Sequence, residues 1–123
     1  MKVSTRAAWA LGLGAIAVTA AAGQHLSHEV TFDTAKPYAR GSMADVRNSA
    51  DSVQWIGCFN LGTSGQCTAV NSAGVQHSCS TTDPAKLAMI GTIHEDSYLA
   101  FRWDPNGICV SIEVSSYSSY ATK

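Results

Sequence analysis

The densest alternation of apolar and polar positions runs from Ser97 to Val114. Apolar residues recur at every second position on both sides of the tetrapeptide Asp104–Gly107. Alternation with a period of two predicts strands with one buried face, and proline and glycine at the second and fourth turn positions fit a type I turn. The stretch therefore predicts a β-hairpin whose core-facing positions are Leu99, Phe101, Trp103, Ile108, Val110, Ile112 and Val114.

The register of this hairpin depends on its turn. Pairing Trp103 with Ile108 places all the large apolar side chains on one face. A bulge at Gly107, which is common after a type I turn, shifts the pairing by one residue and divides the apolar set between the two faces. Because such a slip is costly where one face is buried, we expect the hairpin without the bulge.

Three further strands are predicted upstream. Apolar and polar residues alternate from Asp51 to Asn60, and shorter strand patterns cover 66–70 and 75–79. Glycine-containing turns separate the three segments. Such tight connections favour antiparallel neighbours over parallel crossovers.

One helix is predicted between these strands and the hairpin. Asp83 is a suitable N-cap, Pro84 fits the first helical position, and Leu87 and Ile90 supply an apolar face. Gly91 limits the helix to two or three turns. The predicted fold class is α+β: a small antiparallel sheet of about five strands in the order β-β-β-α-β-β, with one short helix on a face.

The ends of the chain have a different character. Residues 1–22 combine Lys2 and Arg6 with an apolar run and small-residue motifs that end at Ala20 and Ala22, which predicts a secretory signal peptide. The apolar run is shorter than the ~20 residues that a membrane-spanning helix needs, so no membrane span is expected after cleavage. We expect an extended N-terminal arm over 23–50 with one helical turn near 42–48, the folded domain over 51–116, and a polar tail over 117–123.

Charge narrows the list of partners. The whole chain has 8 basic and 9 acidic residues, and removing Lys2 and Arg6 leaves 6 basic against 9 acidic residues, a net charge of −3. A mildly acidic domain without a basic stripe does not suit nucleic acid. The roughly 100 remaining residues form one small domain, for which covalent cross-links are useful.

Four cysteines indicate such cross-links. An even number of cysteines in a short exported chain predicts disulfides, and the spacing does not match the paired CxxC motifs of zinc sites. Cys58 and Cys67 flank a short turn, which favours their pairing and leaves Cys79 to pair with Cys109. The alternative of 58–109 with 67–79 remains open. A disulfide-stabilised fold predicts a periplasmic or secreted location.

Residues suited to catalysis or metal binding are few. His77 and His94 lie in the predicted domain, but no nucleophile motif or metalloprotease motif accompanies them. We therefore assign no catalytic residue and lean against an enzyme. His25, His28, Glu29 and Asp33 are donor side chains in the predicted arm, yet free tails often contain such residues, so we expect no metal and no other cofactor.

The aromatic residues favour a binding role. Aromatic side chains on a sheet face are usually core, whereas Tyr117 and Tyr120 lie in a serine-rich terminus and suit contacts with a protein partner. The hypothesis is a small exported, non-enzymatic binding or inhibitor-like module that acts through a surface patch or a strand edge on a protein in the periplasm or medium. The alternatives are a small secreted hydrolase using His77 or His94 and a structural component of the cell envelope.

Export and oxidation give the first testable prediction. Protein recovered from an exporting host should be shorter than the full chain by about 20–23 residues, and it should contain no free thiol. Intact-mass analysis with and without a thiol-alkylating reagent measures both properties. A full-length mass with reactive thiols would contradict them.

Overall fold

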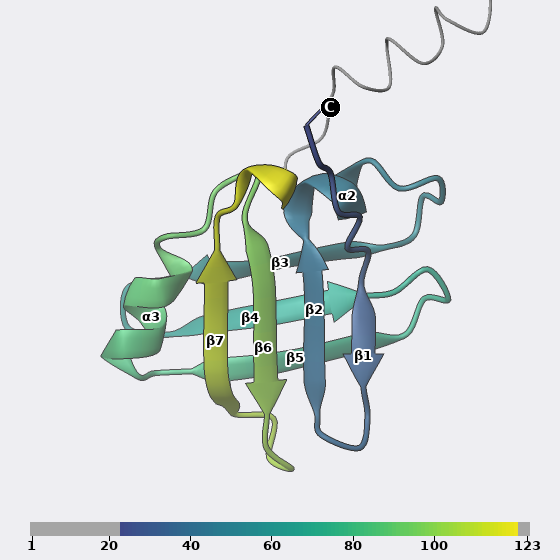
Figure 1. Cartoon of the computed structure of the whole chain (residues 1–123). Helices are drawn as coiled ribbons and strands as arrows, with labels where there is room; N and C mark the ends of the chain where they lie inside the picture. The colour runs from purple at the N-terminus through teal and green to yellow at the C-terminus, as the bar shows by residue number, and fades with distance from the viewer. Residues whose placement is uncertain (1–22, 121–123) are drawn as a thin grey trace, which may run out of the picture.

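A computed structural model describes residues 23–120 as two packed antiparallel sheets (Figure 1). The predicted signal peptide lies outside the described residues. The first sheet has the strand order β1-β2-β6-β7 and the second has the order β3-β4-β5. Their bounds are β1 Thr31–Asp33, β2 Tyr38–Ser42, β6 Tyr98–Trp103 and β7 Cys109–Ser115 in the first sheet, and β3 Trp55–Asn60, β4 Gly65–Val70 and β5 Gln76–Thr81 in the second.

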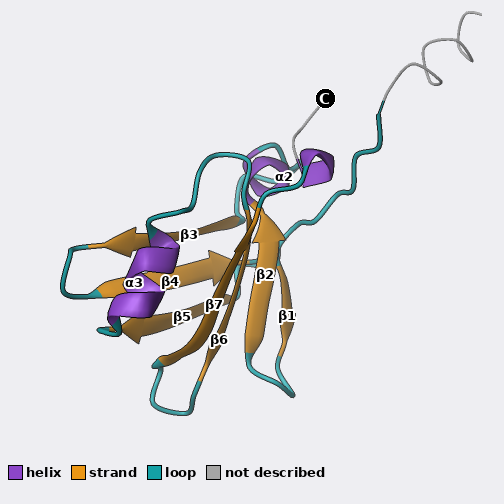
Figure 2. Ribbon diagram, turned by 60° about the vertical axis from the view of Figure 1, so that its left-hand side comes forward, coloured by secondary structure: helices purple, strands orange, loops and turns teal. Residues whose placement is uncertain are grey.

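The two sheets form the layers of a sandwich. Strands β3, β4 and β5 run across the direction of the other four strands, so that the two sheets cross (Figures 1 and 2). Helix α3 (Pro84–Ile90) lies at one end of the sandwich, and α2 (Met43–Arg47) follows directly after β2. A 3-10 helix, η1 (Ser118–Tyr120), ends the described chain. No helix within residues 23–120 has the length and apolar character needed to cross a membrane.

The predicted fold class is confirmed, and so is the order β-β-β-α-β-β after Asp51. There are seven strands rather than about five, because residues 23–50 contain β1 and β2 where we expected an extended arm; the helical turn expected near 42–48 is present as α2. Val30, Ala39 and Val46 from this segment are buried in the core. The small residues of β2 gave little alternation in the sequence, since alanine and glycine are weak markers of a buried strand face.

The terminal hairpin forms, but the predicted register is wrong. Phe101 pairs with Ile112 and Trp103 pairs with Cys109, with a register shift between Arg102 and Trp103. The shift leaves Val110 as the extra residue, so that Val110 and Ile108 are about half exposed instead of facing the core.

The conformation of the Asp104–Gly107 turn is consistent with the shifted register of the hairpin. Gly107 has a φ of 77°, a backbone conformation that suits glycine. The carboxylate of Asp104 accepts hydrogen bonds from the backbone N–H groups of Asn106 (2.8 Å) and Ile108 (3.0 Å). The shifted register also turns Cys109 towards the core, where it is bonded to Cys79. The Cys79–Cys109 disulfide therefore requires the shifted register, in which Trp103 pairs with Cys109. The apolar pattern alone disfavours this register.

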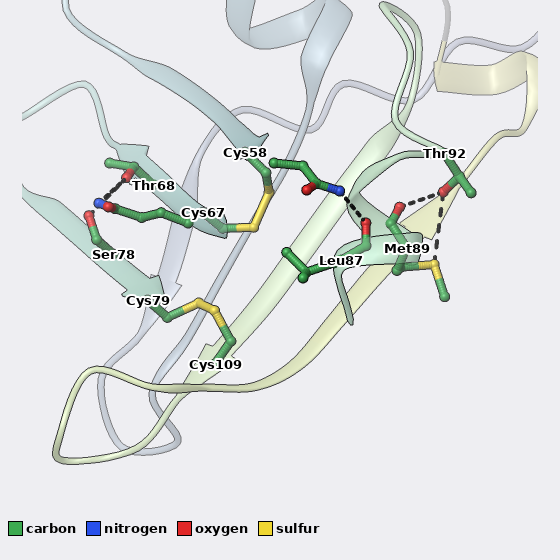
Figure 3. The surroundings of a disulfide bond; sticks show 11 residues. Cys58, Cys67, Thr68, Ser78, Cys79, Leu87, Met89, Thr92 and Cys109 are labelled. Atoms are coloured by element: carbon green, nitrogen blue, oxygen red, sulfur yellow. Dashed lines mark hydrogen bonds between the residues drawn. A yellow bond between two sulfur atoms is a disulfide. The ribbon is translucent and has the colours of Figure 1, made fainter. Parts of the chain in front are cut away.

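Both predicted disulfides are present in the favoured pairing (Figure 3). Cys58 and Cys67 are direct partners in the β3–β4 ladder. Cys79 of β5 and Cys109 of β7 join one sheet to the other. Two disulfides indicate an oxidising environment outside the cytoplasm, periplasmic or extracellular.

Helix α3 begins and packs as its sequence predicts. The side chain of Asp83 accepts a hydrogen bond from the backbone N–H of Ala85, and Pro84 is the first helical residue. Leu87 and Ile90 are buried and approach Gly65 so closely that a Cβ there would lie 2.9 Å from the Leu87 side chain. Gly65 thus lets the helix close one end of the sandwich.

A buried glutamine ties the N-terminal segment to the start of β3. The side-chain carbonyl of Gln54 accepts a hydrogen bond from the backbone N–H of Val30 (3.0 Å), and its amide donates to Glu29 and to Asp51 (both 2.6 Å). The hydrogen bond that Asp51 accepts from the Gln54 side chain, with the two that it accepts from the backbone N–H groups of Gln54 and Val53, holds the pKa of the Asp51 carboxyl well below its usual range.

The packing of the hairpin predicts the effect of one substitution. Phe101 is fully buried between the sheets, so Phe101→Ala should lower the free energy of unfolding by about 3–5 kcal/mol. Urea denaturation of the oxidised protein measures this change. Val110→Ala, at the exposed bulge of the same hairpin, is the control and should change stability by less than about 0.5 kcal/mol. Equal stabilities of the two variants would show that the hairpin is not the core.

Candidate functional site

His77, a candidate catalytic residue of the hydrolase alternative, lies in an aromatic stack at the edge of the core. Its ring stacks on Trp103 (centroids 4.8 Å apart) and meets the edge of Phe32 (4.6 Å). No carboxylate within the described residues forms a hydrogen bond or an ion pair with it. This surrounding is typical of a packing role.

His94 lies in the exposed loop before β6. Its Nε2 is 2.9 Å from the hydroxyl of Ser116, and its Nδ1 accepts a long hydrogen bond from the backbone N–H of Asp96. The neighbouring Asp96 carboxylate lies near Arg47 (3.9 Å) instead. The structure therefore brings neither histidine into a pair with a carboxylate.

The four donor side chains of the N-terminal segment are directed to different partners. His28 packs edge-on against the stacked rings of Tyr98 and Tyr120, and Glu29 accepts a hydrogen bond from Gln54. Asp33 accepts hydrogen bonds from the backbone of the β1–β2 turn. His25 contacts Asp45. Across residues 23–120, no three His, Cys, Asp or Glu side chains come together as a metal site.

The two candidate tyrosines lie where the chain ends meet. Tyr120 stacks on Tyr98 (5.1 Å between centroids), and burial with these neighbouring rings raises its pKa above the usual value. Tyr117 is largely exposed. The chain leaves β7 at Ser115 and turns into η1, where the carbonyl of Ser119 accepts a hydrogen bond from Leu26. The last strand thus does not extend through these tyrosines, and α3 packs beside β7.

The outer face of the four-stranded sheet is charged and solvated. Arg40 and Arg102 lie over the ring of Tyr38, whose hydroxyl donates a hydrogen bond to Glu113 (3.3 Å). Partial burial raises the pKa of Tyr38, with Tyr98 and Glu113 adding to the effect. A shallow hollow of about 270 Å³ lies beside these residues.

The outer face of the three-stranded sheet has the opposite character. By strand register, its side chains form three rows across β3, β4 and β5, and none of them is charged. We call this surface the uncharged face; it comprises Trp55, Val70 and Gln76, then Gly57, Thr68 and Ser78, then Phe59, Gln66 and Ser80.

Apolar side chains are exposed at both ends of the uncharged face. Trp55 and Phe59 are 50% and 49% exposed, although aromatic residues on a sheet face were expected in the core. A Cβ at Gly57, between them on the same strand face, would meet no other atom within 4 Å. The two rings therefore stand on either side of an open strip, whose floor includes the hydrogen-bonded hydroxyls of Thr68 and Ser78 (2.9 Å).

A groove continues the face beyond Phe59. It has a volume of about 290 Å³, and Phe59, Leu61 and Ile108 form its apolar walls while Gln66 and Ser80 lie along its floor. Ile108 reaches this position because its backbone forms a parallel bridge with Ser80 beside β5. Leu61, at 73%, is the most exposed of these side chains.

The sequence contains a signal for this surface that residue-by-residue reasoning missed. From Ser52 to Thr82 there is no Asp, Glu, Lys or Arg. A buried strand needs apolar residues on its inner face, but its solvent face normally carries charges. The absence of charge from both faces of three consecutive strands marks an unusual outer surface.

Comparisons with known proteins give no assignment: a scan against protein-family models, a search of curated proteins and a search of solved structures each returned no match.

The meeting of the chain ends predicts the effect of a truncation. Ending the chain after Val114 removes the Tyr120–Tyr98 stack and the Leu26–Ser119 hydrogen bond, and should lower the free energy of unfolding by about 1–3 kcal/mol. Urea denaturation measures the loss. Tyr117→Ser, at an exposed position, is the control and should be close to the parent. A truncated chain as stable as the parent would mean that residues 115–120 fray.

Proposed function

We propose that this chain is a small exported binding module that captures a protein partner through the uncharged face. The observation that carries the proposal is the exposure of two aromatic side chains, Trp55 and Phe59, on a rigid surface that contains no charged residue. Exposed apolar groups gathered in one patch are typical of interaction sites.

The composition of the face favours a protein partner. The centres of protein interfaces are rich in aromatic residues and poor in charged ones. Here aromatic rings occur together with the aliphatic side chains of Leu61 and Ile108 and with hydroxyl and amide groups. Aliphatic groups suit the side chains of another protein, and the hydroxyls and amides supply hydrogen bonds at its edge.

The same composition defines what the partner presents. Removing a charge from water without a matching charge is costly, so the partner's contacting segment has to be apolar or neutral. The groove beside Phe59 has room for an apolar side chain of that segment. The charged outer face of the other sheet is left to solvent.

The construction of the module supports high-affinity capture. The face lies on three paired strands, and Cys67 and Cys79 fix two of these strands from the inner side through their disulfides. A surface held in place before binding loses little conformational entropy on association. This rigidity suits a presenting surface better than a catalytic cleft, and the separate positions of His77 and His94 give no support to the hydrolase alternative.

Substitutions on the face test the proposal. The oxidised chain without residues 1–22 is immobilised and exposed to periplasmic or secreted extract, and each captured protein is quantified by mass spectrometry. Trp55→Ser and Phe59→Ser should each weaken binding about 30-fold, the effect of losing a hot-spot residue worth about 2 kcal/mol.

The matched control is Tyr117→Ser, which removes an exposed aromatic side chain outside the face. Its binding should equal that of the parent. If Tyr117→Ser abolishes capture while the two face variants retain it, the partner site is at the C-terminus. Concentration-dependent self-association that Phe59→Ser removes would instead make a second copy of this chain the occupant, and would favour the envelope component.

A further inference from the structure

The geometry points to a copper or nickel site at the processed N-terminus, formed by Gly23, Gln24 and His25. It depends on cleavage of the predicted signal peptide after Ala22, one of the two cleavage positions that the small-residue motifs indicate. Cleavage there leaves a chain whose third residue is histidine. The inference is independent of the uncharged face and of any protein partner.

Three consecutive residues supply four nitrogen donors in such a chain. They are the new α-amino group of Gly23, the backbone nitrogens of Gln24 and His25, and Nδ1 of the His25 ring. Successive chelate rings hold them in one plane around the ion, and a square-planar nitrogen set favours Cu²⁺ or Ni²⁺. Neither Gln24 nor His25 is a proline, so both backbone nitrogens carry a proton that the metal can replace.

Binding is an exchange of protons for the metal without a change of oxidation state. The two backbone N–H groups and the ammonium group of Gly23 each release a proton to solvent, and the ion gains four nitrogen bonds. Since protons and the metal compete for the same nitrogens, the affinity has to fall as the pH falls.

The ring of His25 is already oriented for this role. Its Nε2 lies 2.7 Å from a carboxylate oxygen of Asp45. A carboxylate accepts hydrogen bonds, so Nε2 donates the hydrogen bond to Asp45, and Nδ1 is the nitrogen whose lone pair is available to a metal ion. Nδ1 is shielded from solvent and has no hydrogen-bond partner among the described residues. The nitrogen that the metal requires is therefore the one that the fold leaves unused.

Asp45 is itself held in place. Its side chain is 5% exposed, and its second carboxylate oxygen accepts a hydrogen bond from the backbone N–H of His28 (2.8 Å). A carboxylate that orients a metal-binding histidine through its other ring nitrogen is a common outer partner in metal sites. Asp45 would be a positioning residue here, without contact to the ion.

The two residues before His25 have room to close around an ion. Gly23 and Gln24 are exposed and have no regular structure. The first backbone–backbone hydrogen bond after the described N-terminus is donated by Leu26 to Ser119, directly after the three-residue motif. Within residues 23–120, the backbone N–H groups of Gln24 and His25 have no hydrogen-bond acceptor to give up.

Copper titration of defined N-termini tests the site. Oxidised chains that begin at Gly23 and at Ala21 are titrated with Cu²⁺ alone, and the visible absorption and electron paramagnetic resonance spectra are recorded. The Gly23 chain should bind one ion with the spectrum of four planar nitrogens. The Ala21 chain should lack this spectrum, because its His25 is no longer third from the amine.

Single substitutions distinguish copper bound at the four-nitrogen site from copper bound by other histidine side chains. In the Gly23 chain, Gln24→Pro removes one backbone N–H and His25→Ala removes the ring, and each should abolish the four-nitrogen spectrum. His28→Ala keeps the motif and should retain it. Asp45→Asn should weaken binding about 10–100-fold while keeping the spectrum.

Two outcomes would overturn the inference. One is a four-nitrogen spectrum that persists in the Ala21 chain or in Gln24→Pro, which would place the copper elsewhere. The other is an exported protein whose N-terminal sequence begins at a residue other than Gly23, since the amine would then be out of position. Both measurements are independent of partner capture by Trp55 and Phe59.

Discussion

The side chain of Cys109 points towards the core, and this orientation sets both the register of the terminal hairpin and the covalent link between the two sheets. Cys109 has to face the core because its sulfur is bonded to Cys79 of the opposite sheet. That requirement moves the register of β7 by one residue at its start and turns Val110 and Ile108 outwards. A covalent bond thus prevails over the burial of two aliphatic side chains, each of which contributes about 2 kcal/mol when fully buried. Ile108 then becomes a wall of the groove on the uncharged face.

The elements that the sequence revealed are those with strong local signals. Asp83 and Pro84 mark the start of α3, and long alternation marks β6 and β3. The register of the hairpin did not follow from such signals, because it is set by a bond to a residue thirty positions away in the chain. Strand β2 was missed for a related reason: Ala39 and Gly41 are small, and their burial depends on pairing with β6.

The candidate sites were less predictable than the fold. Tyr120 was expected in a polar tail, yet it packs on Tyr98, the first residue of the neighbouring strand β6. Trp55 was expected in the core because aromatic residues on a sheet face are usually buried. The sequence of a single strand does not reveal which of its two faces is covered, so it could not correct this expectation. The uncharged stretch from Ser52 to Thr82 was visible in the sequence. It indicates a binding surface only together with the strand register, which places half of its side chains on the outer face of β3, β4 and β5.

The pairing of β2 with β6 has a consequence for the order in which the chain folds. These strands are separated by more than fifty residues, and the three-stranded sheet is formed entirely by the chain between them. The β3–β4 hairpin and its Cys58–Cys67 bond join near neighbours and can form locally, whereas the four-stranded sheet has to wait for the terminal hairpin to emerge. Contacts between distant residues slow folding. Strands β1 and β2 can pair with each other early, but the second edge of β2 stays open until β6 is available, so the four-stranded sheet is the later of the two sheets to be completed.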